Sequence, residues 1–330
     1  MPELRKLGNS GIEVRPLCLG SNVFSWTIDE ATSFKILDGF LAVDFNFIDT
    51  ADIYPKWAPG NKGGESEIII GNWMKQRGNR KNVILGTKCG HSWGMGPESK
   101  SGLSKRYILE AAEDSLKRLQ TDYIDLYQAH QDDPKTPLDE TLEAFAQLIR
   151  QGKVRAIGAS NYSAERLKES FDVSKADSLP RYECLQPLYN LYERAEYEAS
   201  LEPLCLREGV GVIPYFSLAS GFLTGKYRSK NDLAQSARGS RVEKYLNPRG
   251  FRILDALDQV AQDRNSTPAR VALAWLMARP SITAPIASAT KLDQLTDLIE
   301  ATRLKLDSAA LDLLTSASAE AAETVVSAGV

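Results

Sequence analysis

Four side chains in the first 130 residues have the types needed to move a proton. Asp49, Lys88 and His130 each end an apolar run, and Tyr54 follows Asp49 by five residues. A lysine beside a tyrosine favours the phenolate and lowers the tyrosine pKa from about 10, while a carboxylate keeps the lysine charged. A nearby histidine can orient a substrate oxygen. Together these types predict a tyrosine-centred general acid/base that protonates a carbonyl oxygen, with hydride coming from a cofactor.

The elements that must position these residues are short apolar runs that alternate with amphipathic helical stretches. The predicted strands cover residues 14–19, 45–49, 83–88, 123–130, 154–160, 184–187, 210–215 and 282–287. Thr27, Ser104 and Thr136 are predicted to cap the helices that follow three of these strands. Eight β-then-α units without an internal linker predict a closed (β/α)8 TIM barrel, read as one domain over residues 1–330.

Two additions to the barrel are predicted, an N-terminal hairpin that turns at residues 7–12 and a C-terminal helix over 307–321. The C-terminal ends of parallel barrel strands meet at the active-site mouth, so we expect Asp49, Lys88 and His130 to converge there beside Tyr54. No Gly-x-Gly-x-x-Gly or Gly-x-x-x-x-Gly-Lys-Ser/Thr pattern occurs, which disfavours a Rossmann or P-loop nucleotide site.

Composition excludes several other function classes. The chain has only two histidines and four scattered cysteines, so we expect no metal site and read the cysteines as buried free thiols. Forty basic residues against 43 acidic ones give a net charge of -3, which predicts no general attraction to nucleic acid or membranes. The sequence shows neither a signal peptide nor a membrane span, so a cytoplasmic location is predicted.

Five segments, in fixed order along nearly the whole chain, resemble motifs of a known family. They are NFIDTADIY (46–54), GESE (64–67), TDYIDLYQAH (121–130), VRAIGASN (154–161) and FLTGKY (222–227). The sequence resembles the aldo-keto reductase superfamily, in particular its bacterial members related to the potassium-channel β subunits. That resemblance implies a (β/α)8 barrel and NADP(H)-dependent reduction of aldehydes or ketones, or the reverse reaction. It also implies a catalytic tetrad with Tyr54 as proton donor, made of Asp49, Tyr54, Lys88 and His130.

The same resemblance assigns the cofactor contacts. Ser160, Asn161 and Gln186 are similar to the residues that hold the nicotinamide carboxamide, and Tyr215 to the residue on which the ring stacks. The remaining implied contacts are Ser217, Leu218 and Lys226 at the pyrophosphate, Ser288, Thr290, Lys291 and Gln294 at the adenosine phosphate, and Asp297 at the adenine. Leu298 stands where relatives commonly carry Asn, so NAD(H) stays open beside NADP(H).

Several features keep more than one interpretation. Residues 226–249 hold seven basic side chains against Asp232 and Glu243, which predicts an anion-binding surface unless the run is simply solvated. The predicted walls of the substrate pocket are three tryptophans in loops after strands, namely Trp26, Trp57 and Trp93. His91 is interpreted either as part of that pocket or as a residue of a surface loop.

Three functions remain open at the level of sequence. The first is a carbonyl reductase acting on a small carbonyl or alcohol substrate. The second is a cofactor-binding redox sensor or partner subunit with little turnover, and the third is an aldolase that forms a Schiff base on Lys88. The tetrad and the implied cofactor contacts favour the first. The physiological substrate, the direction of reaction and the oligomeric state are not predicted.

Overall fold

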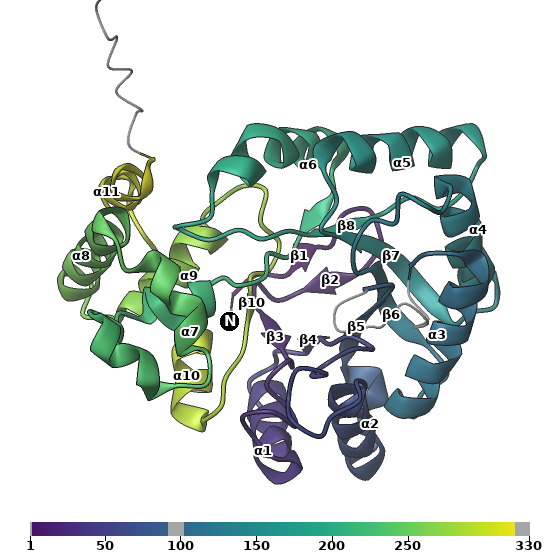
Figure 1. The fold of residues 1–330 in the computed structure, drawn as a ribbon, viewed down its shortest axis with the longest axis horizontal. Coiled ribbons are helices and arrows are strands. Elements are labelled where there is room, and N and C mark those ends of the chain that lie inside the picture. The colour runs from purple at the N-terminus through teal and green to yellow at the C-terminus, as the bar shows by residue number, and fades with distance from the viewer. Residues whose placement is uncertain (1, 92–101, 321–330) are drawn as a thin grey trace, which may run out of the picture.

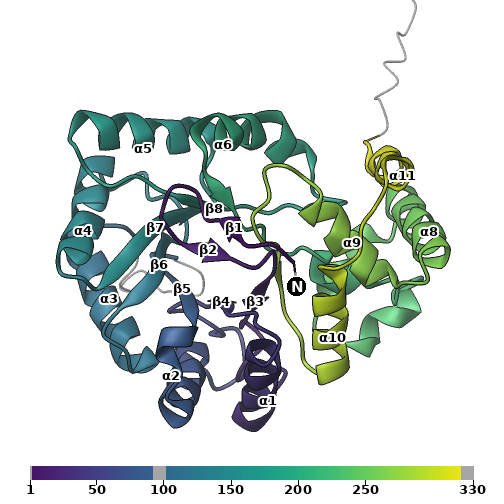
Figure 2. The same cartoon turned by 180° about the vertical axis from the view of Figure 1, so that it is seen from behind.

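The computed structural model describes residues 2–91 and 102–320, and its centre is a ring of eight parallel strands (Figures 1 and 2). The strands are β3 (Cys18–Gly20), β4 (Phe47–Asp49), β5 (Ile84–Cys89), β6 (Ile124–Ala129), β7 (Val154–Ser160), β8 (Cys184–Gln186), β9 (Gly211–Val212) and β10 (Ile286–Ala287). They follow the chain order, with β10 beside β3. The ring closes through a parallel bridge between Val212 and Ile282 and through the Ile286 N–H, which donates to Pro214 O at 2.9 Å. The predicted TIM barrel is confirmed.

Helices surround the strands on the outside of the barrel (Figures 1 and 2). They are α1 (Glu30–Leu41), α2 (Glu65–Arg77), α3 (Lys105–Leu119), α4 (Leu138–Arg150), α5 (Ala164–Ala176), α6 (Glu202–Glu208), α7 (Gly239–Val242), α8 (Pro248–Asp263), α9 (Pro268–Met277) and α10 (Leu292–Ala301). The predicted C-terminal helix is present as α11 (Ser308–Ser318) and packs against α8. Within the described residues, no helix combines the length and the apolarity that crossing a membrane requires.

Helix caps follow the sequence prediction at one of three positions. The Ser104 hydroxyl accepts from the Tyr107 N–H and begins α3, as predicted. Thr27 does not cap α1, because the helix begins after Asp29, whose carboxylate accepts from the Thr32 N–H at 2.8 Å. Thr136 donates to the Asp133 carboxylate instead of capping, so α4 begins after Pro137. An aspartate thus provides the cap of α1, whereas no side chain caps α4.

The predicted hairpin is also present, as β1 (Arg5–Lys6) paired with β2 (Glu13–Val14). It lies across the end of the barrel where the strands begin (Figure 2). Its buried residues Leu7 and Ile12 belong to one apolar cluster with residues of the barrel strands. The four cysteines are buried and free, as expected, and Cys18 and Cys184 belong to this cluster. This end of the barrel is therefore a closed packing surface, and polar groups are left to the opposite end.

Gly8 and Gly11 in the hairpin turn provide a matched test of this closure. Both have left-handed φ values, +58° and +75°, but a Cβ on Gly8 would lie 2.1 Å from Glu183 O, whereas a Cβ on Gly11 would meet nothing within 4 Å. We expect Gly8→Ala to lower the free energy of unfolding by about 1–3 kcal/mol more than Gly11→Ala, which carries only the backbone strain. Urea denaturation of both variants measures the difference, and equal losses would contradict the close packing of the hairpin.

Candidate active site

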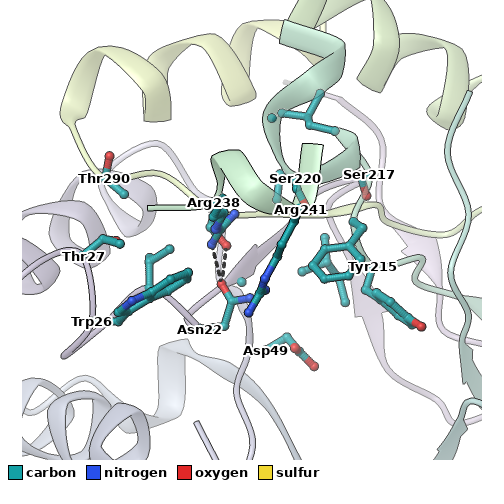
Figure 3. A pocket seen from close by; sticks show the side chains of 18 of the residues that line it. Asn22, Trp26, Thr27, Asp49, Tyr215, Ser217, Ser220, Arg238, Arg241 and Thr290 are labelled. Atoms are coloured by element: carbon teal, nitrogen blue, oxygen red, sulfur yellow. Dashed lines mark hydrogen bonds between the residues drawn. The ribbon is translucent and has the colours of Figure 1, made fainter. Parts of the chain in front are cut away.

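A cavity of about 1370 Å³ opens where the barrel strands end (Figure 3). Its walls include the last residues of five strands, which are Gly20 of β3, Asp49 of β4, Ser160 of β7, Gln186 of β8 and Ala287 of β10. Loops after the strands supply much of the rest, together with residues of α7, α9 and α10. This is the end of a parallel barrel at which catalytic residues are found, so the cavity is the candidate active site.

A buried ion pair lies at the base of the cavity. Lys88 has no exposed surface, and its Nζ lies 2.7 Å from Asp49 Oδ2 and donates to Thr50 O at 2.6 Å. Burial by itself would lower the pKa of Lys88, but the adjacent Asp49 carboxylate raises that pKa above its ordinary value. Lys88 is therefore an ammonium at neutral pH. It does not line the cavity, whereas Asp49 does.

The second carboxylate oxygen of Asp49 is held by two glutamines that sequence reasoning either missed or assigned elsewhere. Gln186 and Gln128 donate to Asp49 Oδ1 at 2.9 and 3.3 Å. Gln128 was not predicted, although it lies two residues before His130 and so shares a strand face with it. Gln186 was assigned to the cofactor on resemblance, and in this structure it lines the cavity while bonding Asp49. The three side chains connect β4, β6 and β8 across the barrel.

Tyr54 lies beside this ion pair. Its ring centroid is 4.8 Å from Lys88 Nζ, 5.7 Å from the His130 ring and 5.5 Å from the Trp57 ring. Burial raises the pKa of Tyr54, and the opposing attraction of Lys88 does not cancel the effect of burial. The prediction of a lowered tyrosine pKa is therefore wrong in direction, because the phenolate loses more hydration than Lys88 restores. Tyr54 is a neutral phenol at pH 7, which is the acid form.

His130 follows β6 and is only 6% exposed. Its backbone is fixed on both sides, since its N–H donates to Cys89 O at 2.8 Å and its carbonyl accepts from Asn161 Nδ2 at 2.9 Å. Burial, reinforced by Lys88 and His91, lowers the pKa of His130 well below its ordinary value. Among the described residues, Nδ1 of His130 has no hydrogen-bond partner. The site thus offers a neutral imidazole with one ring nitrogen unused.

The predicted pocket walls are partly accounted for. Trp26 and Trp57 line the cavity, with ring centroids 5.8 Å apart in an edge-to-face arrangement. Trp93 lies outside the described residues. His91, which had two interpretations, lines the cavity and meets the His130 ring at 4.8 Å.

The predicted cofactor residues are gathered around the same cavity, with one exception. Those that line it are Ser160, Asn161, Gln186, Tyr215, Ser217, Leu218, Lys226, Ser288, Thr290, Gln294 and Asp297. The Tyr215 hydroxyl donates to Asn161 Oδ1 at 2.8 Å, which fixes both side chains. Lys291 is exposed at the N-cap of α10 and does not line the cavity, because the chain turns there to begin the helix.

The basic run over residues 226–249 divides into two groups. Four of its side chains bind carboxylates away from the cavity, through the ion pairs Arg228–Asp258, Lys230–Glu243, Lys244–Glu193 and Arg249–Glu320. The other three line the cavity and are Lys226, Arg238 and Arg241. The sequence prediction of an anion-binding surface counted seven basic side chains, and three of these face the cavity.

Arg238 and Arg241 lie together over Trp26, with guanidinium carbons 5.4 and 5.7 Å from its ring centroid (Figure 3). Arg238 donates to Asn22 Oδ1 at 3.1 Å, and burial together with Arg241 lowers the pKa of Arg238 to about 10. Within the described parts of the chain, no carboxylate pairs with either arginine. Two uncompensated guanidinium groups at a cavity wall favour a ligand that carries negative charge there.

The loop after β9 lies beside this anion-binding subsite, and Ser217, Leu218, Ser220 and Gly221 line the cavity. Its N–H groups are partly used within the loop, because Ala219 donates to Phe216 O at 2.7 Å and Gly221 donates to Leu218 O at 2.8 Å. The fit of the subsite to phosphate groups therefore rests on side-chain charge.

Asp52 is a further ionisable group that sequence reasoning missed. Burial and the nearby Glu67 raise the pKa of Asp52 to about 7. Its Oδ2 accepts from the Tyr107 hydroxyl at 3.4 Å, and Oδ1 has no partner in residues 2–91 and 102–320. The only sequence signal was its place in the loop that carries Tyr54. Asp52 is therefore a group near the site whose charge changes at neutral pH.

Comparison with known proteins agrees with this geometry. The sequence pattern of the Aldo/keto reductase family matches residues 16–319. The chain is 37% identical to "Uncharacterized oxidoreductase YrpG" of Bacillus subtilis over 94% of each chain. It is 35% identical to "Aldo-keto reductase YhdN" of the same organism, over 93% of this chain and 90% of that one. It is 33% identical to "Probable voltage-gated potassium channel subunit beta" of Oryza sativa subsp. japonica, over 91% and 90%. The chain belongs to the aldo/keto reductase family.

Proposed function

We propose that this protein is an NADP(H)-dependent oxidoreductase that reduces an aldehyde or ketone to an alcohol, or catalyses the reverse reaction. Membership of the aldo/keto reductase family supports an oxidoreductase, while the cofactor and the residue roles are our proposal. The observation that carries it is the neutral phenol of Tyr54 beside the Lys88–Asp49 ion pair, at a cavity whose lining includes Arg238 and Arg241. A proton donor and an anion-binding subsite in one cavity suit a phosphate-bearing hydride donor.

The residues present fit such a cofactor. Ser160, Asn161 and Gln186 offer a hydroxyl and two amides to the nicotinamide carboxamide, and the Tyr215 ring offers a stacking face. The loop after β9, with the cavity-facing cations Lys226, Arg238 and Arg241, would hold the phosphates. Three such cations favour NADP(H), which carries one phosphate more than NAD(H). When bound, the nicotinamide supplies hydride to the carbonyl carbon.

The chain's own groups supply the proton chemistry. The substrate oxygen binds between the Tyr54 hydroxyl and the His130 ring. The centroids of the Tyr54 and His130 rings are 5.7 Å apart. Tyr54 gives its proton to that oxygen, and Lys88 stabilises the phenolate that remains. Asp49 keeps Lys88 charged and fixed in position. The indoles of Trp26 and Trp57 exclude water from the reacting centre, which strengthens each of these electrostatic interactions.

The geometry disfavours the Schiff-base alternative. An amine that attacks a carbonyl must be neutral and must reach the substrate. Lys88 is charged, has no exposed surface and donates to both Asp49 and Thr50 O.

The other alternative is a cofactor-binding redox sensor, which the channel-subunit name of one relative suggests. A sensor would differ from the proposed enzyme only in having little turnover. Steady-state assays with NADPH and a panel of aldehydes and ketones separate these two.

Replacing the proposed proton donor tests the function directly. Tyr54→Phe keeps the ring that contacts Trp57 and removes only the hydroxyl. We expect kcat for carbonyl reduction to fall by roughly 10²–10⁴-fold, which is the usual size of general acid catalysis. The dissociation constant for NADPH, measured by fluorescence titration, should change less than about twofold. Undiminished turnover by Tyr54→Phe would remove Tyr54 from this role.

The pH dependence of reduction should reflect Asp52 and not histidine. Burial lowers the pKa of His91 and, further, that of His130, so both imidazoles are neutral at pH 7. Burial and Glu67 raise the pKa of Asp52 to about 7, so Asp52 gains a proton as pH falls through 7. The negative charge of Asp52, which opposes phenolate formation at Tyr54, is then lost. We expect reduction to accelerate severalfold below pH 7 in the wild type. Asp52→Asn should show the fast rate at every pH.

Rate–pH profiles of the wild type and of Asp52→Asn check this expectation. A loss of activity centred near pH 6.5 in both proteins would indicate protonation of a histidine instead, and would contradict the lowered histidine pKa values.

Two substitutions that each remove one positive charge from residues 226–249 test the anion-binding subsite. Arg238→Gln removes a cation that lines the cavity, and Lys230→Gln removes an exposed cation bound to Glu243. We expect Arg238→Gln to weaken NADPH binding by about 10–100-fold, as loss of a charged hydrogen bond does. Lys230→Gln should change it less than about twofold. Equal effects, measured by titration at one salt concentration, would mean that only the net charge matters.

A further inference from the structure

The C-terminal helix α11 is anchored beside a segment that leads back to the cavity. It packs against α8 (Figure 1), and its last residue, Ser318, is buried. The last carbonyls of a helix have no partner within the helix. Arg249, at the start of α8, donates to Ser318 O through Nε at 3.1 Å and through Nη2 at 2.8 Å. The guanidinium therefore caps α11 and joins it to the beginning of α8.

The same guanidinium begins a row of stacked side chains. Its Nη2 also donates to Tyr192 O at 2.8 Å, and its carbon lies 4.5 Å from the centroid of the Tyr192 ring. The Tyr192 ring meets the Tyr245 ring edge-to-face at 4.8 Å, and Tyr245 stacks on Phe222 at 5.3 Å. Each of these contacts is attractive beyond the apolar area that it buries. We call Arg249, Tyr192, Tyr245 and Phe222 the aromatic row.

The two inner members of the aromatic row belong to segments that line the cavity. Phe222 lies in the loop after β9, next to Gly221, which lines the cavity. Tyr245 ends the helical turn Glu243–Tyr245, which directly follows α7, and Arg241 of α7 lines the cavity as part of the anion-binding subsite. The row thus connects the end of α11 to the segment that carries Arg241 and to the loop beside it.

Close packing leaves the aromatic row little room to shift. A Cβ on Gly250 would lie 1.8 Å from Tyr245 O and 3.0 Å from Phe222 Cζ. Glu193 binds the same turn, because it accepts from Lys244 Nζ at 2.6 Å and from the Tyr245 hydroxyl at 3.3 Å. A displacement of one member of the row is therefore transmitted to the next, since no void is present to absorb it.

We propose that Arg249 is a positioning residue for the anion-binding subsite, acting through Tyr192 and Tyr245 on the segment that carries Arg241. Arg249 does not itself line the cavity. It holds the first ring of the aromatic row, and the row holds the turn after α7, so Arg241 is ordered at the cavity wall before a ligand arrives. A side chain that is already ordered loses less freedom on binding. The inference rests on the proposed function for the identity of the ligand, NADP(H).

Two arginines at opposite ends of α11 provide a matched test. Each binds a carboxylate next to the helix, Arg249 at Glu320 and Arg264 at Asp307, but only Arg249 contacts Tyr192. We expect Arg249→Met to raise the dissociation constant for NADPH about 3–30-fold, the range for a residue that acts without touching the ligand. Arg264→Met should change it less than about twofold. Arg249→Lys, which keeps a cation over Tyr192, should restore part of the affinity.

The titrations are made at about 0.15 M salt, where the Debye length of about 8 Å limits the distant effect of the charge that both variants lose. Circular dichroism and urea denaturation show that each variant is folded. Weakened binding in Arg264→Met equal to that in Arg249→Met would overturn the proposal. So would an Arg249→Met protein that is less stable in urea but binds NADPH as the wild type does, because Arg249 would then only anchor α11.

A double-mutant cycle tests whether Arg249 acts through Arg241. If it does, Arg249→Met should weaken NADPH binding less in an Arg241→Gln protein than in the wild type, whereas losses that simply multiply would contradict the proposal. Inorganic pyrophosphate, titrated by calorimetry, is a second probe of the same variants. If the wild type binds pyrophosphate but not NADPH, the proposed cofactor fails, and the pyrophosphate affinities decide the role of Arg249. Binding of neither would remove the subsite and this proposal with it.

Discussion

The buried ion pair between Lys88 and Asp49 is the interaction on which the site depends. A lysine with no exposed surface stays charged only because a carboxylate lies 2.7 Å from it, and Gln128 and Gln186 hold that carboxylate in turn. Removing one partner would leave an uncompensated charge in the barrel, so the pair is constrained on both sides. Burial keeps the Tyr54 phenol neutral, and the ion pair places the charged Lys88 beside it.

The barrel separates packing from chemistry along its axis. The hairpin and the apolar cluster around Leu7 and Phe47 close one end, and the ionisable residues meet at the other. At that end the cavity has two differently charged parts. Arg238 and Arg241, which have no carboxylate partner in the described part of the chain, give one part positive charge, and the neutral rings of Tyr54 and His130 form the other. A molecule that spans both parts brings an anionic group to the arginines and a reacting group to the phenol.

Much of this arrangement could be predicted from sequence, because strand periodicity fixes which residues lie at strand ends. Asp49, Lys88 and His130 follow from that rule, and the family motifs indicated the residues that we propose for the cofactor. What could not be predicted depends on three-dimensional burial. The direction of the Tyr54 pKa reflects desolvation against attraction to Lys88, and the titration of Asp52 reflects its burial beside Glu67. Likewise, charge counting could not tell the paired Lys230 from the cavity-facing Arg238.

We propose that Tyr54 is a neutral acid whose conjugate base is stabilised by Lys88. The most direct test is the titration of Tyr54 itself, followed by NMR on protein labelled at the tyrosine ring carbons and assigned by comparison with Tyr54→Phe. We predict that Tyr54 titrates above its ordinary value of 10.0 in the wild type, and higher still in Lys88→Met. A titration below 10.0, or one that Lys88→Met leaves unmoved, would contradict the account.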